Sequence, residues 1–345
     1  MRVNAETILA HLPKGHGAKL FAVVKANGYG HGAVQVARAA LTGGAWGLAV
    51  ATLEEAQELS GLVRGERVLV MGGLTERDAA AAAAIGCAIT VSSLGLAKAL
   101  GDRDAGVPVH LKIDTGMGRF GCSPADAPAI AKFIDEAPSL MLAGTSTHFA
   151  CADTDEAMTR RQFDLFIDAL STFEVDPGLR HACNSAATRR HPEFALDAVR
   201  AGIALYGCEW PGTRPAMTLR SVVTHLKTVG VGDTVGYGAT WRAVARTPVA
   251  TVAIGYADGV SRVRSNRGHV LIRGHRAPLI GVVSMDAITV DVSNVPGVQV
   301  GDVVTVIGED ESDRIGAEEV AEWSNTISWD VLTSIGPRVE RRYSE

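Results

Sequence analysis

The chain of 345 residues has few lysines, few cysteines and no excess of positive charge. Only seven of its 33 basic residues are lysines, and the formal net charge is −5. A surface that binds nucleic acid needs a basic patch, and no cluster of lysine and arginine of that kind occurs. The five cysteines are odd in number, scattered and without a C-x-x-C pair. This usage favours free thiols, and we expect neither a metal site nor a nucleic-acid partner.

Long hydrophobic runs are also scarce. Only residues 79–97 form a long stretch without charge, and that stretch is mostly alanine, interrupted by glycine, threonine and serine. We interpret it as a helix, a turn and a short strand over 88–91, not as a membrane span. No secretory signal is visible in the first twenty residues. We therefore expect a soluble, cytoplasmic protein that does not bind membranes.

Short apolar runs alternate with helix-like stretches from residue 20 to about 210. Strand and helix repeated in this way predict a parallel sheet with crossover helices. Eight runs favour a (β/α)8 barrel, and a doubly wound sheet is the alternative. The runs are 21–24, 47–50, 68–71, 88–91, 109–113, 141–147, 179–183 and 199–205.

The pattern changes after about Met217, where short alternating strands are separated by turns and only 317–325 resembles a helix. This pattern predicts a mostly β second domain. We place the two domains at residues 1–217 and 218–345.

The segment F-A-V-V-K-A-N-G-Y-G-H-G, residues 21–32, carries the strongest chemical signal. An apolar run ends in Lys25, and a glycine-rich loop with Tyr29 follows. An unpaired charge is costly to bury, whereas a partly neutral lysine can form a Schiff base with a carbonyl cofactor. A lysine that extends its charge into solvent from a strand end is the equally open alternative.

Active-site groups of a β/α barrel lie at the carboxyl ends of its strands. The polar and glycine-flanked positions that follow or flank the predicted strands are Lys25, Arg119, His148, Asn184, Ser185, Arg200, Gly202 and Ile203. The last two loops of such a barrel often bind phosphate. Ser185 and the amides of Gly202 and Ile203 are therefore candidate phosphate ligands. Without further context, His148 could also be an ordinary core histidine.

Segment 21–32 resembles the attachment site for pyridoxal 5'-phosphate (PLP) in alanine racemases. The resemblance implies that Lys25 carries the cofactor and that Tyr29 lies near its phosphate. Residues 114–119, D-T-G-M-G-R, resemble the motif whose arginine, here Arg119, contacts the cofactor phenolate and the substrate carboxylate. Lys112 matches a lysine that many members carry as a carbamate. An ordinary ion pair with Asp114 or a nearby carboxylate is as strong an interpretation of Lys112.

Residues 147–150, T-H-F-A, resemble the family segment whose histidine, His148, abuts the arginine that faces the pyridine nitrogen. Arg200 matches that arginine. Because arginine stays protonated and cannot accept a proton, the nitrogen is expected to remain neutral. A neutral pyridine is a weaker electron sink, which would limit side reactions such as transamination.

Two segments of the second domain extend the resemblance. G-Y-A-D-G, residues 255–259, resembles the motif whose tyrosine, Tyr256, is the second catalytic base, although a structural tyrosine before a tight turn is the commoner case. G-V-V-S-M-D, residues 281–286, resembles the segment that meets the substrate, which implies substrate-binding roles for Met285 and Asp286. In the family both segments reach the partner subunit's site, so a homodimer is expected.

The resemblance therefore implies a PLP-dependent isomerase that interconverts L- and D-alanine, a peptidoglycan precursor, by two bases, Lys25 and the partner's Tyr256. Three alternatives remain open: a preference for serine or another small amino acid, a PLP decarboxylase of similar architecture, and a non-catalytic PLP-binding protein of cofactor homeostasis.

Three departures from the family pattern affect substrate preference and cofactor affinity. Val282 replaces a common arginine, and Trp329 replaces a phosphate-contacting tyrosine. The N-terminus is short, and we therefore expect the family's usual leading strand to be shortened or absent.

Overall fold

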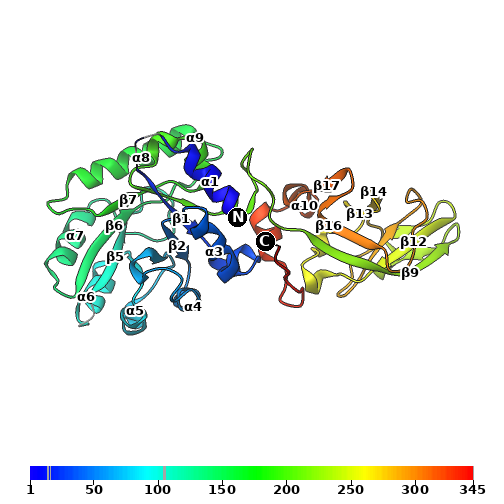
Figure 1. Cartoon of the computed structure of the whole chain (residues 1–345), viewed down its shortest axis with the longest axis horizontal. Coiled ribbons are helices and arrows are strands. Elements are labelled where there is room, and N and C mark those ends of the chain that lie inside the picture. The colour runs from blue at the N-terminus through cyan, green and yellow to red at the C-terminus, as the bar shows by residue number, and fades with distance from the viewer. Residues whose placement is uncertain (14, 16, 104–105, 345) are drawn as a thin grey trace. The chain divides into compact units, whose positions relative to one another are not determined.

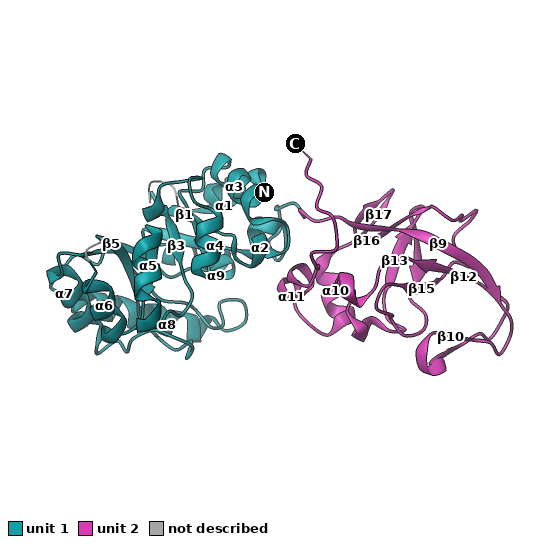
Figure 2. Cartoon of the chain, turned by 90° about the horizontal axis from the view of Figure 1, so that it is seen from below, with its two compact units in different colours: residues 1–214 teal, residues 215–345 magenta. Residues whose placement is uncertain are grey.

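The computed structural model describes residues 1–13, 15, 17–103 and 106–344 (Figure 1). The chain divides into two compact units, Met1–Arg214 and Pro215–Glu345 (Figure 2). Among the described residues, no helix is both long enough and apolar enough to cross a membrane.

The first unit is a closed barrel of eight parallel strands, β1 to β8 in sequence order. The barrel closes because β1 pairs with β2 on one side and with β8 on the other. The (β/α)8 prediction is confirmed, and the doubly wound sheet was wrong. The strands are β1 Lys19–Val23, β2 Gly47–Val50, β3 Val68–Val70, β4 Ala88–Val91, β5 Val107–Lys112, β6 Leu140–Ser146, β7 Leu179–His181 and β8 Ala198–Ala201.

Helices follow the strands and cover the outside of the barrel (Figure 1). Because parallel strands are covered on both faces, their residues are nearly all apolar, and every residue of β2, β4 and β8 is buried. Arg2–His11 form helix α1, and no described residue before β1 is in a strand. The further helices of this unit are α2 Lys25–Tyr29, α3 Ala33–Thr42, α4 Leu53–Glu58, α5 Ala79–Ile85, α6 Leu94–Gly101, α7 Ala127–Glu136, α8 Glu156–Ser171 and α9 Ser185–Arg190.

The sequence predicts a single strand over the eighth apolar run, 199–205, and this prediction is wrong. Strand β8 ends at Ala201, and Ile203–Tyr206 form the 3-10 helix η4. The backbone leaves the strand at Gly202 (φ −110°, ψ −90°). All four residues of η4 are buried, and an apolar run alone cannot distinguish a buried strand from a buried helical turn.

The second unit is built on an antiparallel sheet in the order β14-β13-β16-β9-β12-β15, with β17 paired to β16. It confirms the mostly β domain. Its strands are β9 Leu219–Val229, β12 Thr247–Val252, β13 His269–Ile272, β14 His275–Pro278, β15 Ile288–Asp291, β16 Val303–Asp310 and β17 Asp313–Ile315, with a separate pair β10 Thr234–Val235 and β11 Trp241–Arg242.

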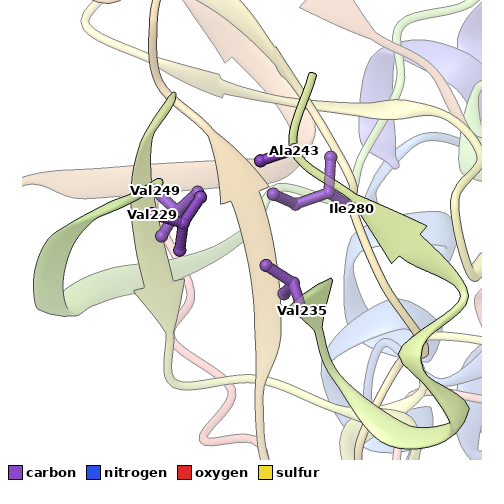
Figure 3. Close-up of a cluster of buried hydrophobic side chains, with 5 residues drawn as sticks. All are labelled: Val229, Val235, Ala243, Val249 and Ile280. Carbon is purple, nitrogen blue, oxygen red and sulfur yellow. The ribbon is translucent and has the colours of Figure 1, made fainter. Parts of the chain in front are cut away.

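A small hydrophobic cluster joins the β10–β11 pair to the main sheet (Figure 3). Val235 of β10 packs there against side chains from β9, β12 and the neighbouring loops, and Trp241 covers it. This packing anchors a two-stranded hairpin that would be only marginally stable by itself. The buried members are Val229, Val235, Ala243, Val249 and Ile280.

Two helices close the second unit: α10 Ala317–Ser324 and α11 Ser328–Thr333. The sequence predicts the first but not the second. Asn325 adopts a left-handed conformation (φ 52°) and ends α10, so that the chain starts again as a helix of only six residues. Its N-cap, Ile327, makes no side-chain cap, which removes the usual sequence signal for a helix start.

Candidate active site

Lys25 lies just past the carboxyl end of β1, where the backbone makes an unusual turn. Ala26, Asn27, Gly28 and Tyr29 have φ values of 53°, 52°, 60° and 48°, so four successive residues are left-handed. Each non-glycine residue in this region costs about 1–2 kcal/mol. The turn is closed by Gly28 N–H donating to Val24 O (2.8 Å). It places Lys25, half-buried, at the rim of the barrel.

The environment of Lys25 lowers the pKa of its amine. Burial, and then the positive charge of Arg119, lower the pKa of Lys25, while the Glu55 carboxylate opposes the shift. An amine with a lowered pKa is a better nucleophile near neutral pH. This arrangement supports the Schiff-base interpretation over a lysine whose charge is simply solvated.

Arg200 of β8 is 5 % exposed and held by uncharged acceptors. Its Nη1 donates to Nδ1 and O of His181 (2.5 and 2.9 Å). Its Nη2 donates to the carbonyls of Thr147 and Ala182 (2.7 and 2.9 Å) and lies 3.2 Å from Nδ1 of His148. These hydrogen bonds involve both terminal nitrogens, and none of them involves Nε. Although burial lowers the pKa of Arg200 to about 10, it remains charged at neutral pH.

A line of hydrogen bonds continues from Arg200 into the barrel core. Because arginine only donates, the His181 Nδ1 must accept, and the His181 Nε2 then carries the proton toward His110 Nδ1 (2.8 Å). Burial, reinforced by Arg200, lowers the pKa of His110 to about 3 and that of His181 and His148 well below the usual value. The three histidines are therefore neutral acceptors and donors around a buried cation.

Lys112, the last residue of β5, lies beside two arginines. Its Nζ and the Cζ of Arg119 lie 5.2 and 5.1 Å from the centroid of the same Phe120 ring. Burial, and then the charges of Arg200 and Arg119, lower the pKa of Lys112 to about 7. Within the described part of the chain, no carboxylate lies within ion-pair distance of Lys112.

Asp114 shapes the loop that carries Arg119. Its carboxylate accepts from the amides of Gly116, Met117 and Gly118 at 2.9 to 3.1 Å. Burial would raise the pKa of Asp114, but these hydrogen bonds lower it overall. The carboxylate is thus committed to the loop, which gives no support to a direct Lys112–Asp114 pair.

The loops after β7 and β8 form a small polar cradle near Tyr29. A Cβ at Gly202 would lie 2.6 Å from the Tyr29 hydroxyl, so a larger residue there would displace the tyrosine side chain. The Ser185 Oγ accepts from the amide of Gly202 (3.0 Å), which leaves the serine proton to donate elsewhere. Burial raises the pKa of Tyr29 to about 12, so that its hydroxyl also stays a donor. The Asn184 side chain instead caps α9 by accepting from Ala187 (2.9 Å).

The second unit brings its own predicted residues together. The amide of Tyr256 donates to Ser284 O and that of Ala257 to Met285 O, both at 3.0 Å. Tyr256 is 43 % exposed and Met285 51 % exposed. Both therefore face outward from this unit. Val282 and Trp329 are half-buried in the same unit.

Arg338 links the two segments that carry Tyr256 and Met285. It forms ion pairs with Asp258 (3.0 Å) and Asp286 (2.8 Å), one on each of the two predicted segments. Asp258 also accepts from the Gly255 amide (2.9 Å), which closes the turn that begins with Tyr256. Asp286 is thus paired within its own unit.

Sequence reasoning missed four residues that organise these groups: Glu55, His110, His181 and Arg338. Only Glu55 had a local signal, because Thr52 and Glu55 have the spacing of a capping box and the structure contains one. The other three act through partners far away in the sequence, and no local pattern marks such pairs.

Comparison with known proteins matches both units to one family. Residues 1–209 match the family model "Alanine racemase, N-terminal domain", and residues 216–343 match "Alanine racemase, C-terminal domain". A curated alanine racemase of Sorangium cellulosum is 41% identical over 369 residues, covering 100% of this chain and 97% of that protein.

Solved structures agree with this similarity. The crystal structure of alanine racemase from E. faecalis superposes with a TM-score of 0.93 at 34% identity, covering 99% of this chain and 95% of that one. The alanine racemase from Bacillus anthracis, solved with bound L-Ala-P, gives 0.89 at 37% identity over 98% and 91%.

Proposed function

Because the chain belongs to the alanine racemase family and is an isomerase of that class, we propose that it binds PLP at Lys25 and interconverts L- and D-alanine. The observation that carries the proposal is Lys25 itself, a half-buried amine with a lowered pKa at the rim of the barrel. The bound L-Ala-P of the Bacillus anthracis relative supports alanine as the substrate.

The residues present fit this cofactor. The cradle of Tyr29, Ser185 and Gly202 offers two hydroxyl donors where a phosphate would lie, and a side chain at 202 would fill it. We assign the Ile203 amide and Asn184 to the same region. Arg200 has its Nε left to face the ring nitrogen, with His148 against the same guanidinium. When bound, PLP would withdraw electrons from the substrate and make its Cα hydrogen acidic.

Inversion at Cα requires a proton acceptor on one face and a donor on the other, since one base returning its proton restores the starting enantiomer. We assign the Lys25 amine to one face and the partner's Tyr256 hydroxyl to the other. The exposure of Tyr256, 43 %, makes it available to a second subunit. Homodimer formation is therefore part of the proposal, as are substrate contacts by Arg119 and by the partner's Met285 and Asp286.

Arg200 favours a racemase over a decarboxylase. Its guanidinium cannot accept a proton, and the two histidines that it contacts, His148 and His181, are neutral. None of these groups would keep the ring nitrogen protonated. Decarboxylation benefits from the stronger electron sink of a protonated ring. The match of residues 216–343 to the C-terminal domain disfavours a barrel-only protein of cofactor homeostasis.

Lys112 completes the electrostatics of the site as a carbamate. Its pKa of about 7 leaves a substantial neutral fraction, which can add to carbon dioxide. The neutral amine forms an N–C bond with the carbon of carbon dioxide and releases one proton, so that an anion would lie near Arg119 and Arg200 in place of a lysine. Lys112 and Arg119 both lie against the Phe120 ring, and the charge of Arg119 already acts on Lys112, so that the anion would attract the arginine.

The test is an assay of purified protein with PLP and L-alanine, read by chiral chromatography and by carbon dioxide release. We expect D-alanine, no carbon dioxide, and a borohydride-trapped adduct on the Lys25 peptide. Faster turnover of L-serine than of L-alanine would replace the substrate assignment, and carbon dioxide would indicate the decarboxylase. Protein that traps no PLP at Lys25 would refute the proposal.

A further inference from the structure

We propose that Glu55 is a positioning residue for Lys25: its carboxylate fastens the amide that follows Lys25 to the end of the neighbouring strand, and so fixes the amine at the barrel rim. The inference rests on the proposed role of Lys25. It adds a residue from α4, a helix to which neither the sequence motifs nor the proposed mechanism assigns a role.

The contacts of Glu55 span two strand ends. Its Oε1 accepts from the amide of Ala26, the residue directly after Lys25, at 2.6 Å. Its Oε2 accepts from the amides of Ala51 and Thr52, directly after β2, at 2.7 and 3.3 Å. A capping box at the start of α4 accounts for the contact with Thr52. It does not account for the contact with Ala26, which lies 29 positions away.

The left-handed turn explains why an outside acceptor is needed there. Within the turn, the first backbone bond is donated by Gly28 to Val24 (2.8 Å), so the amide of Ala26 points out of the turn. The far end is fastened as well, since the Asn27 Oδ1 accepts from the Ala33 amide (3.0 Å) at the start of α3. Strained backbone persists only where the surroundings hold it. Glu55 holds the end that carries Lys25.

Glu55 also acts through its charge. Lys25 lies in the field of Arg119, and the Glu55 carboxylate opposes that field. The residue therefore makes two contributions that substitutions can separate: the hydrogen-bonded clamp, which needs reach, and the negative charge, which needs ionisation. Glutamine removes the charge and turns one acceptor into a donor facing an amide, whereas aspartate keeps the charge but is one methylene too short to span both strand ends.

The experiment measures Lys25 in protein freed of cofactor. Acetic anhydride labelling as a function of pH, read on the Lys25 peptide by mass spectrometry, reports protonation of the amine. Borohydride trapping after addition of PLP reports the rate of attachment. For Glu55→Gln we expect the labelling midpoint to move to lower pH. Trapping is compared at a pH above the midpoints of both proteins, where the amine is neutral in each, and there we expect it to slow about tenfold or more, the effect of losing a charged hydrogen bond.

Two further variants separate the loss of the hydrogen-bonded clamp from the loss of charge. Glu55→Asp should keep a labelling midpoint close to that of wild type but still trap PLP slowly, because only the clamp is lost; it also serves if Glu55→Gln does not fold. The matched control is Glu58→Gln, which removes the same charge from an exposed position of the same helix. It should match wild type in both measurements.

Wild-type labelling and trapping in both Glu55 variants would overturn the role of Glu55 while leaving the proposed function intact. Slow trapping with an unmoved midpoint in Glu55→Gln would overturn the charge contribution. If wild-type protein itself traps no PLP at Lys25, the proposed function fails, and that failure is visible before any variant is made.

Discussion

The two units present their candidate groups in opposite ways. In the barrel, Arg200 is 5 % exposed and its terminal nitrogens are all hydrogen-bonded, and Lys25 is held by a turn fastened at both ends. In the second unit, Tyr256 is 43 % exposed, and the segments around it are held by backbone bonds and by the surface ion pairs of Arg338.

This difference indicates a division of labour. The barrel groups are built into a core, so their geometry is set when the barrel folds. The groups of the second unit are exposed, and under the proposed function the partner subunit would complete the site around them. Substitutions in the barrel should therefore affect stability and cofactor binding together, whereas substitutions around Tyr256 should affect turnover alone.

The largest effect is expected for Lys25→Ala. Because the change removes both the attachment point and one proposed base, racemisation should fall by at least about 10⁴-fold. No borohydride-stable adduct should form on the peptide containing residue 25. Lys98→Ala, at an exposed lysine of α6, is the control and should behave as wild type. An active Lys25→Ala protein would contradict the proposed role of Lys25 as the attachment point and base in the barrel.

Tyr256→Phe comes next. Loss of one proposed base should lower turnover by about 10²–10⁴-fold in both directions. The exposed ring contributes little to packing, so the melting temperature should not change. Tyr237→Phe, at a tyrosine of the same unit that is 69 % exposed, is the control. Retained racemisation in Tyr256→Phe would rule out the two-base assignment.

A paired substitution tests the contrast directly. Arg200→Lys leaves buried carbonyl and imidazole acceptors without donors, and we expect it to destabilise the protein by about 1–3 kcal/mol. It should also weaken cofactor binding, since lysine lacks the planar fork. Arg338→Lys changes an exposed arginine and should leave thermal unfolding almost unchanged. Equal shifts in melting temperature would contradict the proposed division between the units.

The smallest effect concerns Lys112. Its folded pKa of about 7 lies below that of an ordinary lysine, so the neutral amine gains population as pH rises through about 7. Carbamate formation, followed by NMR with carbon-13-labelled bicarbonate, should therefore increase over that range and disappear in acid. Lys112→Met should lack the signal. A signal that does not depend on pH near 7 would disprove this assignment.

Much of the fold could be predicted from the sequence, because each barrel strand is a short apolar run between helix-like stretches. Site positions followed from strand ends, as for Lys25 and His148. What could not be predicted depends on contacts between distant residues. The partners of Arg200 lie at the ends of two other strands, β6 and β7, and His181 has nothing local to distinguish it. Strand β9 has no clear apolar alternation, because exposed residues such as Arg220 and Lys227 interrupt it.

The turn from Ala26 to Tyr29 is the mirror image of an ordinary helical turn. Glycine, which has no handedness, or a D-amino acid introduced by chemical synthesis would adopt it without strain. The native L-alanine at position 26 is strained in this conformation, and without its restraints it would prefer the right-handed region. Under the proposed role of Glu55, loss of the hydrogen bond from the Ala26 amide would let this stretch relax and would move Lys25 away from its position at the barrel rim.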